Sequence, residues 1–499
     1  MERHRLAVQK ISQTVASFFA RGQPYRVNKG STNSTRPRPN TNTVDISPLR
    51  HVLSVDRERR VALVEPNVAM DALVEATLPH GLVPPVVMEF PGITAGGGFA
   101  GTAGESSSFR HGYFDEGVRR VEMVLADGRV VEADREGERG DLFRGAAGAV
   151  GTLGLTTLLE VGLMDARRYV RARYRRTGSV AEAVRVVEEE VGKEGNDYVD
   201  GILYSKDHGV VISGSLTDEK PEGVPARTFS GAWDPWFYLH VEERTKNGVE
   251  GDGVVEEYIP LAEYLFRYDR GGFWVGKAAF DYFWFTPFNK WTRWFLDDFL
   301  HTRMLYRALH GSGESARMIV QDLAMPFATA EKFVDYTAGE LGIWPLWLCP
   351  LKRRGPPTFH PFTTLPEGTK SEIDERMMLN VGLWGWGPSK PEGFMRANRA
   401  LEAKVRELGG MKWLYAHTYY PEQEFWDMYG GREWYDRLRE KYNATGLPSV
   451  WDKVHVDEKA LLRKKRSIWP VGGAVGLWKS IQSQDYTIHR GATWKWKGE

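Results

Sequence analysis

Apolar and polar positions follow two different periods along the chain, and the two periods predict both strands and helices. Residues 43–68 alternate like a strand, a turn and a second strand, whereas residues 70–80 have the spacing of a short helix. Residues 118–126 and 129–133 flank an Asp-Gly pair, which is typical of a tight hairpin turn. Mixed periods of this kind predict an α+β fold.

Other segments continue this mixture. Residues 141–146 suit a short helix, residues 148–164 a glycine turn that feeds a buried strand, and residues 179–191 an amphipathic helix. Near the N-terminus, apolar residues from Val8 to Phe19 fall on one face of a further helix, with basic residues nearby. Such a helix either docks on the protein body or lies in a membrane interface, and we expect docking.

The length of the chain and a change of character near residue 165 indicate several domains. A chain of 499 residues exceeds what one hydrophobic core usually organises. We expect one domain over residues 1–165 and a second, of mixed sheet and helix, over residues 166–420. Residues 421–499 are expected to form a helical closing segment and a polar tail that contains tryptophans.

Composition narrows the possible classes of protein. The 66 basic and 66 acidic side chains cancel, which argues against a nucleic-acid partner. The single cysteine, Cys349, cannot form an internal disulfide, and no H-E-x-x-H or paired-cysteine motif predicts a metal site. The N-terminus lacks a secretory hydrophobic region, and no window reaches ~18 uncharged apolar residues, so neither a signal peptide nor a spanning helix is expected.

The most distinctive segment reads TAGGGFAGTAGESSSFRHG and runs from Thr94 to Gly112. Glycines let backbone N–H groups approach a ligand closely, and serine hydroxyls add short donors, so the run predicts a cradle for an anion such as a diphosphate. Gly96, Gly98 and Gly101 also satisfy the dinucleotide fingerprint G-x-G-x-x-G. That fingerprint should follow a buried parallel strand and open a helix, but helix-breaking residues flank it here, so no Rossmann unit is expected.

Several elements in a fixed order carry a resemblance to a known superfamily. They are Lys29-Gly30-Ser31-Thr32-Asn33-Ser34, TAGGGFAGTAG, Arg110-His111-Gly112, Leu125-Ala126-Asp127-Gly128, Asp141-Leu142-Phe143 and Gly151-Thr152-Leu153-Gly154. In this order they resemble the FAD-binding domain of the vanillyl-alcohol oxidase and p-cresol methylhydroxylase (PCMH) superfamily. Gly104-Glu105-Ser106-Ser107-Ser108, Trp347-Leu348-Cys349-Pro350 and Glu424-Phe425-Trp426 are similar, more narrowly, to delta-24 sterol reductases.

The resemblance implies a fold and an activity. The fold is a PCMH-type FAD-binding domain of two α+β subdomains with an α+β cap domain. The activity is that of an FAD-dependent oxidoreductase that passes a hydride from NADPH to the side-chain (delta-24) double bond of a sterol. Two alternatives stay open, namely a flavin oxidase or dehydrogenase that acts on an alcohol, and a non-catalytic sterol-binding relative. The exact sterol or terpenoid alkene and the oligomeric state do not follow from the sequence.

The same resemblance assigns FAD-binding residues to three stretches of the chain. They are Lys29, Gly30, Ser31, Thr32, Asn33, Thr94, Ala95, Gly96, Gly97, Gly98, Phe99, Ala100, Gly101, Thr102, Ala103, Gly104, Glu105, Ser106, His111, Gly151, Thr152 and Gly154. Many superfamily members attach the flavin to a histidine in the first loop or to a cysteine elsewhere. Residues 29–36 contain neither, so noncovalent FAD is expected. Arg171, Arg173 and Arg175 alternate along one strand. One role for them is to bind the phosphates of NADPH, but we expect them to form a solvated strand face.

The chemistry of an isolated alkene constrains the reaction independently of the family. Hydride addition alone would create an unstabilised carbanion, so a protein acid must supply a proton to the less substituted carbon. We place this acid among Glu105, His417 and Tyr435. Glu105 ranks first because it lies beside the expected cofactor in the sequence, and His417 would be charged near neutrality.

Residues 271–294 contain ten aromatic residues and predict either a buried cap core or a membrane-facing surface. A sterol is nearly insoluble in water and must be taken from a membrane, which favours the second role. We therefore expect peripheral attachment to the cytosolic face of a membrane, with the endoplasmic reticulum implied by the family.

Overall fold

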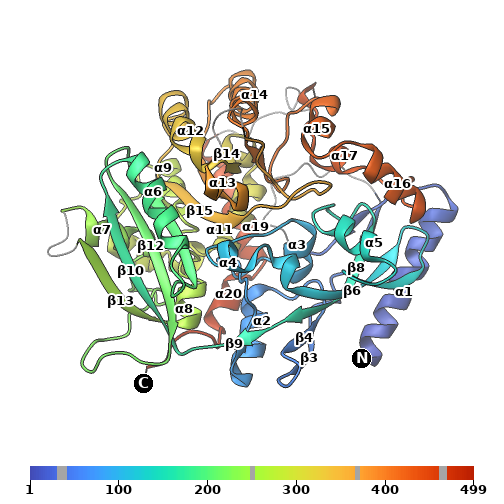
Figure 1. Cartoon of the computed structure of the whole chain (residues 1–499), viewed down its shortest axis with the longest axis horizontal. Helices are drawn as coiled ribbons and strands as arrows, with labels where there is room; N and C mark the ends of the chain where they lie inside the picture. Colours follow the sequence, from blue (N-terminus) through green and yellow to red (C-terminus); the bar gives the residue numbers. More distant parts are fainter. Residues whose placement is uncertain (31–41, 248–252, 366–370, 460–468, 499) are drawn as a thin grey trace.

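The computed structural model describes residues 1–498 apart from 31–41, 248–252, 366–370 and 460–468. Two antiparallel sheets dominate it, and Figure 1 shows them side by side with helices packed around them. The smaller sheet draws on residues 52–162 and the larger on residues 169–412. Helices and antiparallel strands occur together throughout, which confirms the expected α+β class.

The smaller sheet contains the hairpin expected at the Asp-Gly pair. Gly128 has a φ of +91° in this turn, and a Cβ atom there would lie 2.8 Å from Ala16 of the N-terminal helix. Glycine is therefore required both by the left-handed backbone and by the close approach of that helix. In spatial order the strands are β3 (Val52–Asp56), β4 (Val61–Val64), β8 (Gly154–Gly162), β6 (Val118–Leu125) and β7 (Val130–Asp134).

The N-terminal helix α1 (Glu2–Ala20) docks on the protein body, as expected. Val8, Ile11 and Val15 are buried against β6 and β2 (Thr43–Asp45). β2 pairs in parallel with β1 (Arg26–Asn28), the strand that leads into the first expected FAD loop. The helices predicted at 70–80 and 141–146 are α2 (Met70–Thr77) and α5 (Gly140–Ala146).

The larger sheet has helices on both faces. α6 (Val180–Val191), α12 (Phe327–Glu340) and α14 (Pro391–Glu407) cover one face, while α7 (Phe237–Thr245) and α8 (Leu261–Leu265) cover the other. In spatial order its strands are β13 (Val254–Pro260), β10 (Tyr169–Thr177), β12 (Gly209–Thr217), β11 (Tyr198–Leu203), β15 (Leu346–Lys352), β16 (Met377–Trp386), β14 (Met318–Met325) and β17 (Met411–Lys412).

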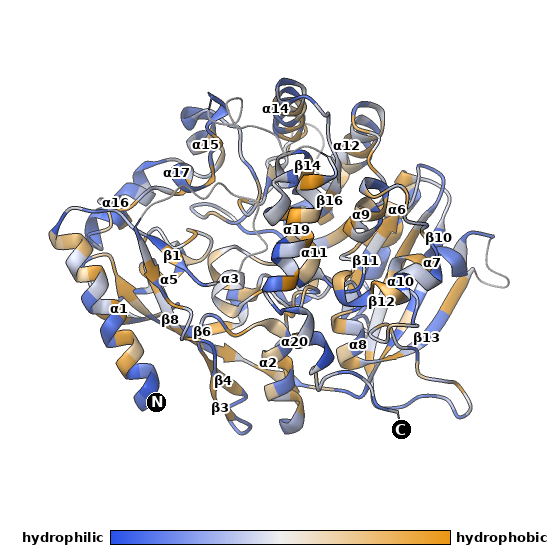
Figure 2. Ribbon diagram, turned by 180° about the vertical axis from the view of Figure 1, so that it is seen from behind, coloured by the Kyte–Doolittle hydropathy of each residue, from blue (hydrophilic) through white to orange (hydrophobic). Residues whose placement is uncertain are grey.

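The C-terminal part returns to both sheets. α15 (Glu422–Met428), α16 (Glu433–Lys441) and α17 (Val450–Val454) confirm the predicted helical closing segment, and α16 packs on α5 of the first sheet. The tail beyond Pro470 contains two further helices, α19 (Val471–Gln482) and α20 (Tyr486–Arg490). α19 lies along α11 (Thr302–Ser312), as Figure 2 shows, and a Cβ atom at Gly476 would lie 2.4 Å from the Ala308 carbonyl oxygen.

A buried charge network joins the glycine-rich run to the larger sheet. The Asp200 carboxylate on β11 accepts hydrogen bonds from Arg267 at 3.0 Å, Tyr268 at 2.7 Å and Trp347 on β15 at 3.0 Å. Arg267 is fully buried and also donates to the Ser106 hydroxyl, at the end of the glycine-rich run, at 3.3 Å. Aspartate and arginine thus neutralise each other at the place where the glycine-rich run meets the larger sheet.

We expect Asp200→Asn to lower the free energy of unfolding by about 3–5 kcal/mol, because the buried Arg267 charge loses its partner. Urea unfolding followed by circular dichroism measures this change. The matched control is Asp218→Asn, since Asp218 forms an exposed ion pair with Arg167 and should leave stability unchanged. Equal stability of the two variants would contradict a structural role for the buried pair.

Candidate active site

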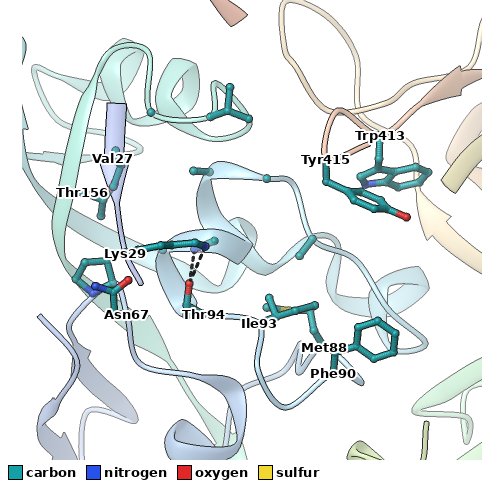
Figure 3. Close-up of a pocket in the computed structure, with 18 of the residues that line it drawn as sticks. Val27, Lys29, Asn67, Met88, Phe90, Ile93, Thr94, Thr156, Trp413 and Tyr415 are labelled. Carbon is teal, nitrogen blue, oxygen red and sulfur yellow. Dashed lines mark hydrogen bonds between the residues drawn. The ribbon is translucent and has the colours of Figure 1, made fainter. Parts of the chain in front are cut away.

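A cavity of about 500 Å³ is walled by residues of both sheets. The smaller sheet contributes Met123 and Gly154, and the larger sheet contributes Asp322, Trp347 and Asn380. Figure 3 shows its two ends, with Lys29 and Thr94 at one and Trp413 and Tyr415 at the other. The two ends differ in chemistry.

The glycine-rich run lines the first end and begins a short helix there, α3 (Ala95–Ala100). Thr94 caps this helix, and its hydroxyl accepts a hydrogen bond from the Gly97 N–H at 3.2 Å. The sequence argument against a Rossmann unit was therefore only half right, because the run does open a helix. The strand that directly precedes the run, β5 (Leu82–Val83), pairs in antiparallel fashion with β9 (Met164–Asp165), so the run does not follow the parallel strand that a Rossmann unit requires.

Side chains at the glycines of this end would collide with neighbouring atoms of the protein. A Cβ atom at Gly97 would lie 3.0 Å from the Thr94 hydroxyl and 3.1 Å from the Lys29 ammonium group. A Cβ atom at Gly96 would lie 2.6 Å from Pro66, and one at Gly101 would lie 2.8 Å from the Gly97 carbonyl oxygen. Glycine therefore permits this close packing, and the start of a helix beside a lysine fits the diphosphate of FAD.

Positive charge gathers at the same end. Lys29 lies 3.4 Å from the Thr94 hydroxyl, and Arg26 and Lys453 also line the cavity. The Lys453 ammonium group donates to the carbonyl oxygens of Val150, at 3.1 Å, and Gly151, at 3.2 Å. Sequence reasoning missed Arg26 and Lys453, because neither belongs to a motif and Lys453 lies far along the chain from the glycines it contacts.

Aromatic rings form the second end. The Phe273 ring lies 4.5 Å from the Trp384 ring and 5.2 Å from the Trp347 ring. Phe90 continues this wall at 5.5 Å from Phe273. Trp413 completes it and donates from its indole nitrogen to the Thr102 carbonyl oxygen at 2.8 Å, which ties this wall to the end of the glycine run. The second end therefore suits an apolar ligand.

Two carboxyl groups, Glu89 and Asp322, line the cavity among the described residues, and sequence reasoning selected neither. Burial, with the neighbouring Glu105, raises the pKa of Glu89 well above its usual value, and its Oε1 atom has no hydrogen-bond partner in the described structure. Burial raises the pKa of Asp322 to about 6, while hydrogen bonds from Asn380 and Tyr415 oppose the rise. The raised pKa of each group depends on burial in the folded chain, which the local sequence does not show.

The three acids predicted from the sequence lie outside the cavity wall. Glu105 is buried and accepts hydrogen bonds from the Ser106 hydroxyl, at 2.7 Å, and from Ser107. Tyr435 donates to the Thr152 hydroxyl at 2.7 Å, and burial raises its pKa to about 12. The carbonyl oxygen of His417 accepts from Lys412 and Gln321, so this residue helps to fix a loop. We therefore do not place the proton donor at any of them.

The expected FAD-binding residues divide into three groups. Ser31, Thr32 and Asn33 lie outside the described residues. Those that do not line the cavity are Ala95, Gly98, Phe99, Thr102, Glu105, Ser106, His111 and Thr152. Those that line it are Lys29, Gly30, Thr94, Gly96, Gly97, Ala100, Gly101, Ala103, Gly104, Gly151 and Gly154. Ala95, Gly98 and Phe99 are buried because one side of α3 faces the protein core.

Comparison with known proteins agrees with this geometry. A family model described as an FAD binding domain matches residues 7–134. Delta(24)-sterol reductase from Homo sapiens is 30% identical over 417 residues, which cover 81% of this chain and 76% of that protein. The chain belongs to the delta(24)-sterol reductase family. The Arabidopsis thaliana member is also 30% identical, over 432 residues that cover 81% of this chain and 74% of that protein.

Family membership and the matched domain make the chain an FAD-dependent oxidoreductase. A more distant similarity is confined to one part of the chain. Decaprenylphosphoryl-beta-D-ribose oxidase from Mycolicibacterium smegmatis is 31% identical over 112 residues, which cover 22% of this chain and 24% of that protein. Similarity between this chain and that oxidase is thus limited to about a fifth of this chain.

We expect Gly101→Val to abolish FAD binding, because its added carbons would press on the Gly97 carbonyl oxygen. Lys29→Met should weaken FAD affinity roughly 10- to 100-fold through loss of a charged hydrogen bond. Flavin absorbance after gel filtration measures both effects, and acid precipitation should release the flavin if it is noncovalent. Gly195→Val is the control, since space around Gly195 is open. Full flavin content in Gly101→Val and Lys29→Met would exclude the glycine run as the diphosphate site.

Proposed function

We propose that this chain reduces the side-chain (delta-24) double bond of a sterol, with FAD passing on a hydride from NADPH. One observation carries the proposal: a single cavity joins a cationic, glycine-lined end to an aromatic end that contains carboxyl groups. The first end suits a diphosphate and the second suits an apolar alkene that needs a proton. The names of the curated relatives, which specify sterol reduction, agree with this substrate class.

Residues of the chain have separable tasks in this reaction. Bound FAD supplies the hydride. Lys29, Lys453 and the N–H groups of α3 bind its diphosphate, while Phe273 and Trp384 hold the apolar substrate and exclude water from the reacting end. Aromatic faces also stabilise the positive character that develops on the more substituted alkene carbon as the proton arrives.

The arginines of β10 do not support an NADPH site there. The arginines on β10 have acidic or amide partners, because Arg173 donates to Asn196 at 3.0 Å and Arg175 to Glu189 at 3.0 Å. They therefore belong to the solvated strand face expected from the sequence. We propose that NADPH and the sterol use the same end of the cavity in turn.

A flavin oxidase that acts on an alcohol is the second candidate, and the similarity to the mycobacterial ribose oxidase favours it. The reductase is better supported, because similarity to the sterol reductases covers 81% of this chain, whereas similarity to the oxidase covers 22%.

Anaerobic incubation of the protein with FAD, NADPH and a delta-24 sterol should give a sterol with a saturated side chain, detected by mass. Rapid reoxidation of the reduced flavin by air, without this product, would favour the oxidase. Absence of bound flavin would favour a non-catalytic sterol-binding protein. Flavin reduction by NADPH without saturated sterol would remove the sterol from the proposal and leave an oxidoreductase of another alkene.

We also propose that the chain docks peripherally on a membrane of the endoplasmic reticulum, facing the cytosol. Among the described residues, no helix is both long and apolar enough to cross a bilayer. The aromatic segment 271–294 divides into two halves. Phe273, Trp274 and Phe280 are buried, whereas Trp284 is 73% exposed and Trp291 60% exposed.

The exposed half forms a surface on and around α10 (Lys290–Phe295). Phe295 is 77% exposed there, and Trp233 stacks on Trp294 with ring centres 4.6 Å apart. Lys290 and Arg293 lie on the same helix. Tryptophan beside basic residues is the composition that binds the interface of a bilayer with anionic lipids.

The double variant Trp291→Ser with Phe295→Ser should lower affinity for phosphatidylcholine–phosphatidylserine vesicles roughly tenfold or more, because two interfacial side chains are lost. Vesicle sedimentation measures this affinity. Phe19→Ser is the matched control, since Phe19 is 47% exposed on α1, far from α10 in Figure 2. A larger loss with the control would move the membrane contact to the N-terminal helix.

A further inference from the structure

The reduction proposed above needs an acid that faces the alkene, and the inference here rests on that proposed function. The cavity offers two carboxyl groups among the described residues, Glu89 and Asp322. They differ in their partners. Glu89 lies beside a second carboxyl group, Glu105, whereas the hydrogen-bond partners of Asp322 are neutral side chains.

Asp322 is fixed from two directions. It lies on β14 in the larger sheet, and one carboxyl oxygen accepts from the side-chain amide of Asn380 on the neighbouring strand β16 at 3.0 Å. The other oxygen accepts from the Tyr415 hydroxyl at 2.8 Å. Both Asp322 and Tyr415 line the cavity, so a bound ligand can meet either group directly.

Tyr415 is itself held in place. The indole nitrogen of Trp384 donates to the Tyr415 hydroxyl at 3.3 Å, so this hydroxyl accepts from Trp384 and donates to Asp322. Trp384 also belongs to the aromatic wall. The hydrogen-bond chain Trp384–Tyr415–Asp322 therefore ties the orientation of the carboxyl group to the surface that receives the apolar ligand.

The titratable groups that face Asp322 from neighbouring elements are uncharged, so none of them offsets the charge of its carboxylate. Tyr306 from α11, Cys349 from β15 and Tyr415 face it, and burial raises the pKa of each of these groups, so all three are neutral near pH 7. Because of burial, the Asp322 pKa is about 6, so part of the population carries the proton near neutrality. The Glu89 pKa is raised further, which makes Glu89 a weaker donor.

We propose that Asp322 is the general acid of the reduction and that Tyr415 is its positioning residue. The carboxyl O–H bond breaks and its proton forms a C–H bond at the less substituted alkene carbon. A hydride from the reduced flavin forms the second C–H bond, at the more substituted carbon, and the π bond is lost. Asp322 is left as a carboxylate and regains its proton from solvent.

Rapid mixing of the NADPH-reduced holoenzyme with a delta-24 sterol, without oxygen, tests this role. Asp322→Asn keeps the hydrogen bond from Tyr415 but has no acidic proton. Flavin reduction by NADPH should stay unchanged in this variant, while flavin reoxidation by the sterol should slow about 100-fold or more. Asp218→Asn is the matched control, since Asp218 is exposed and does not line the cavity, and it should keep the sterol step. Glu89→Gln tests the other carboxyl group of the cavity.

The pH dependence gives the role of Tyr415. In the wild type, the sterol step should slow as pH rises through about 6, because the acid loses its proton. The Tyr415 hydroxyl stabilises the carboxylate form of Asp322, so its removal in Tyr415→Phe favours the protonated form. The midpoint of the pH profile should therefore move to higher pH. A merely structural tyrosine would lower the rate without moving this midpoint.

Infrared spectroscopy supplies a readout independent of turnover. Between about pH 5 and pH 8 the oxidised wild type should lose the carbonyl band of a buried carboxylic acid, and Asp322→Asn should lack this change. A titrating band that persists in Asp322→Asn, or a sterol step that survives in it, would overturn the assignment. A sterol step lost in Glu89→Gln alone would transfer the role to Glu89. If the sterol fails to reoxidise the reduced flavin of the wild type, the proposed function is wrong, and the role of Asp322 is wrong as well.

Discussion

The carboxylate of Asp200 is the contact on which the geometry of the site depends. It holds Arg267, Tyr268 and Trp347 at once, and Arg267 reaches on to Ser106 at the end of the glycine-rich run. Trp347 is also a wall of the cavity. A buried ion pair of this kind adds little net stability compared with an apolar contact, but it allows few alternative arrangements of the groups around it. The aromatic wall is thereby set at a fixed position relative to the glycine run.

The polarity of the cavity follows from this junction of two sheets. The glycine run and β1 bring N–H groups and cations, which favour an anion, while strands of the larger sheet bring tryptophans and the Asp322 carboxyl group. Neither sheet alone has both ends of the cavity. A cofactor with a charged diphosphate and an aromatic ring system spans such a gradient naturally, because each of its parts meets a matching wall.

Local signals in the sequence were sufficient for local structure and for choosing the glycine run as the candidate cradle. The Asp-Gly hairpin, the one-sided pattern of α1 and the glycine run each depend on residues that are close in the chain. The acids of the cavity do not. Asp322 meets Asn380 because β14 and β16 are adjacent strands, and it meets Tyr415 through a loop after β17. Glu105 lies next to the cradle in sequence, yet its carboxylate accepts hydrogen bonds from serine hydroxyls and does not line the cavity.

The division of the cavity wall between two sheets also links cofactor supply to folding. A ligand that binds only the folded chain stabilises it by an amount that grows with the logarithm of its free concentration, about 2.7 kcal/mol at a hundred times its dissociation constant. Because a flavin in this cavity would contact walls from both sheets, that stabilisation acts on the junction as well as on each sheet. The abundance of the folded protein in a cell would then follow the availability of flavin, independently of any sterol.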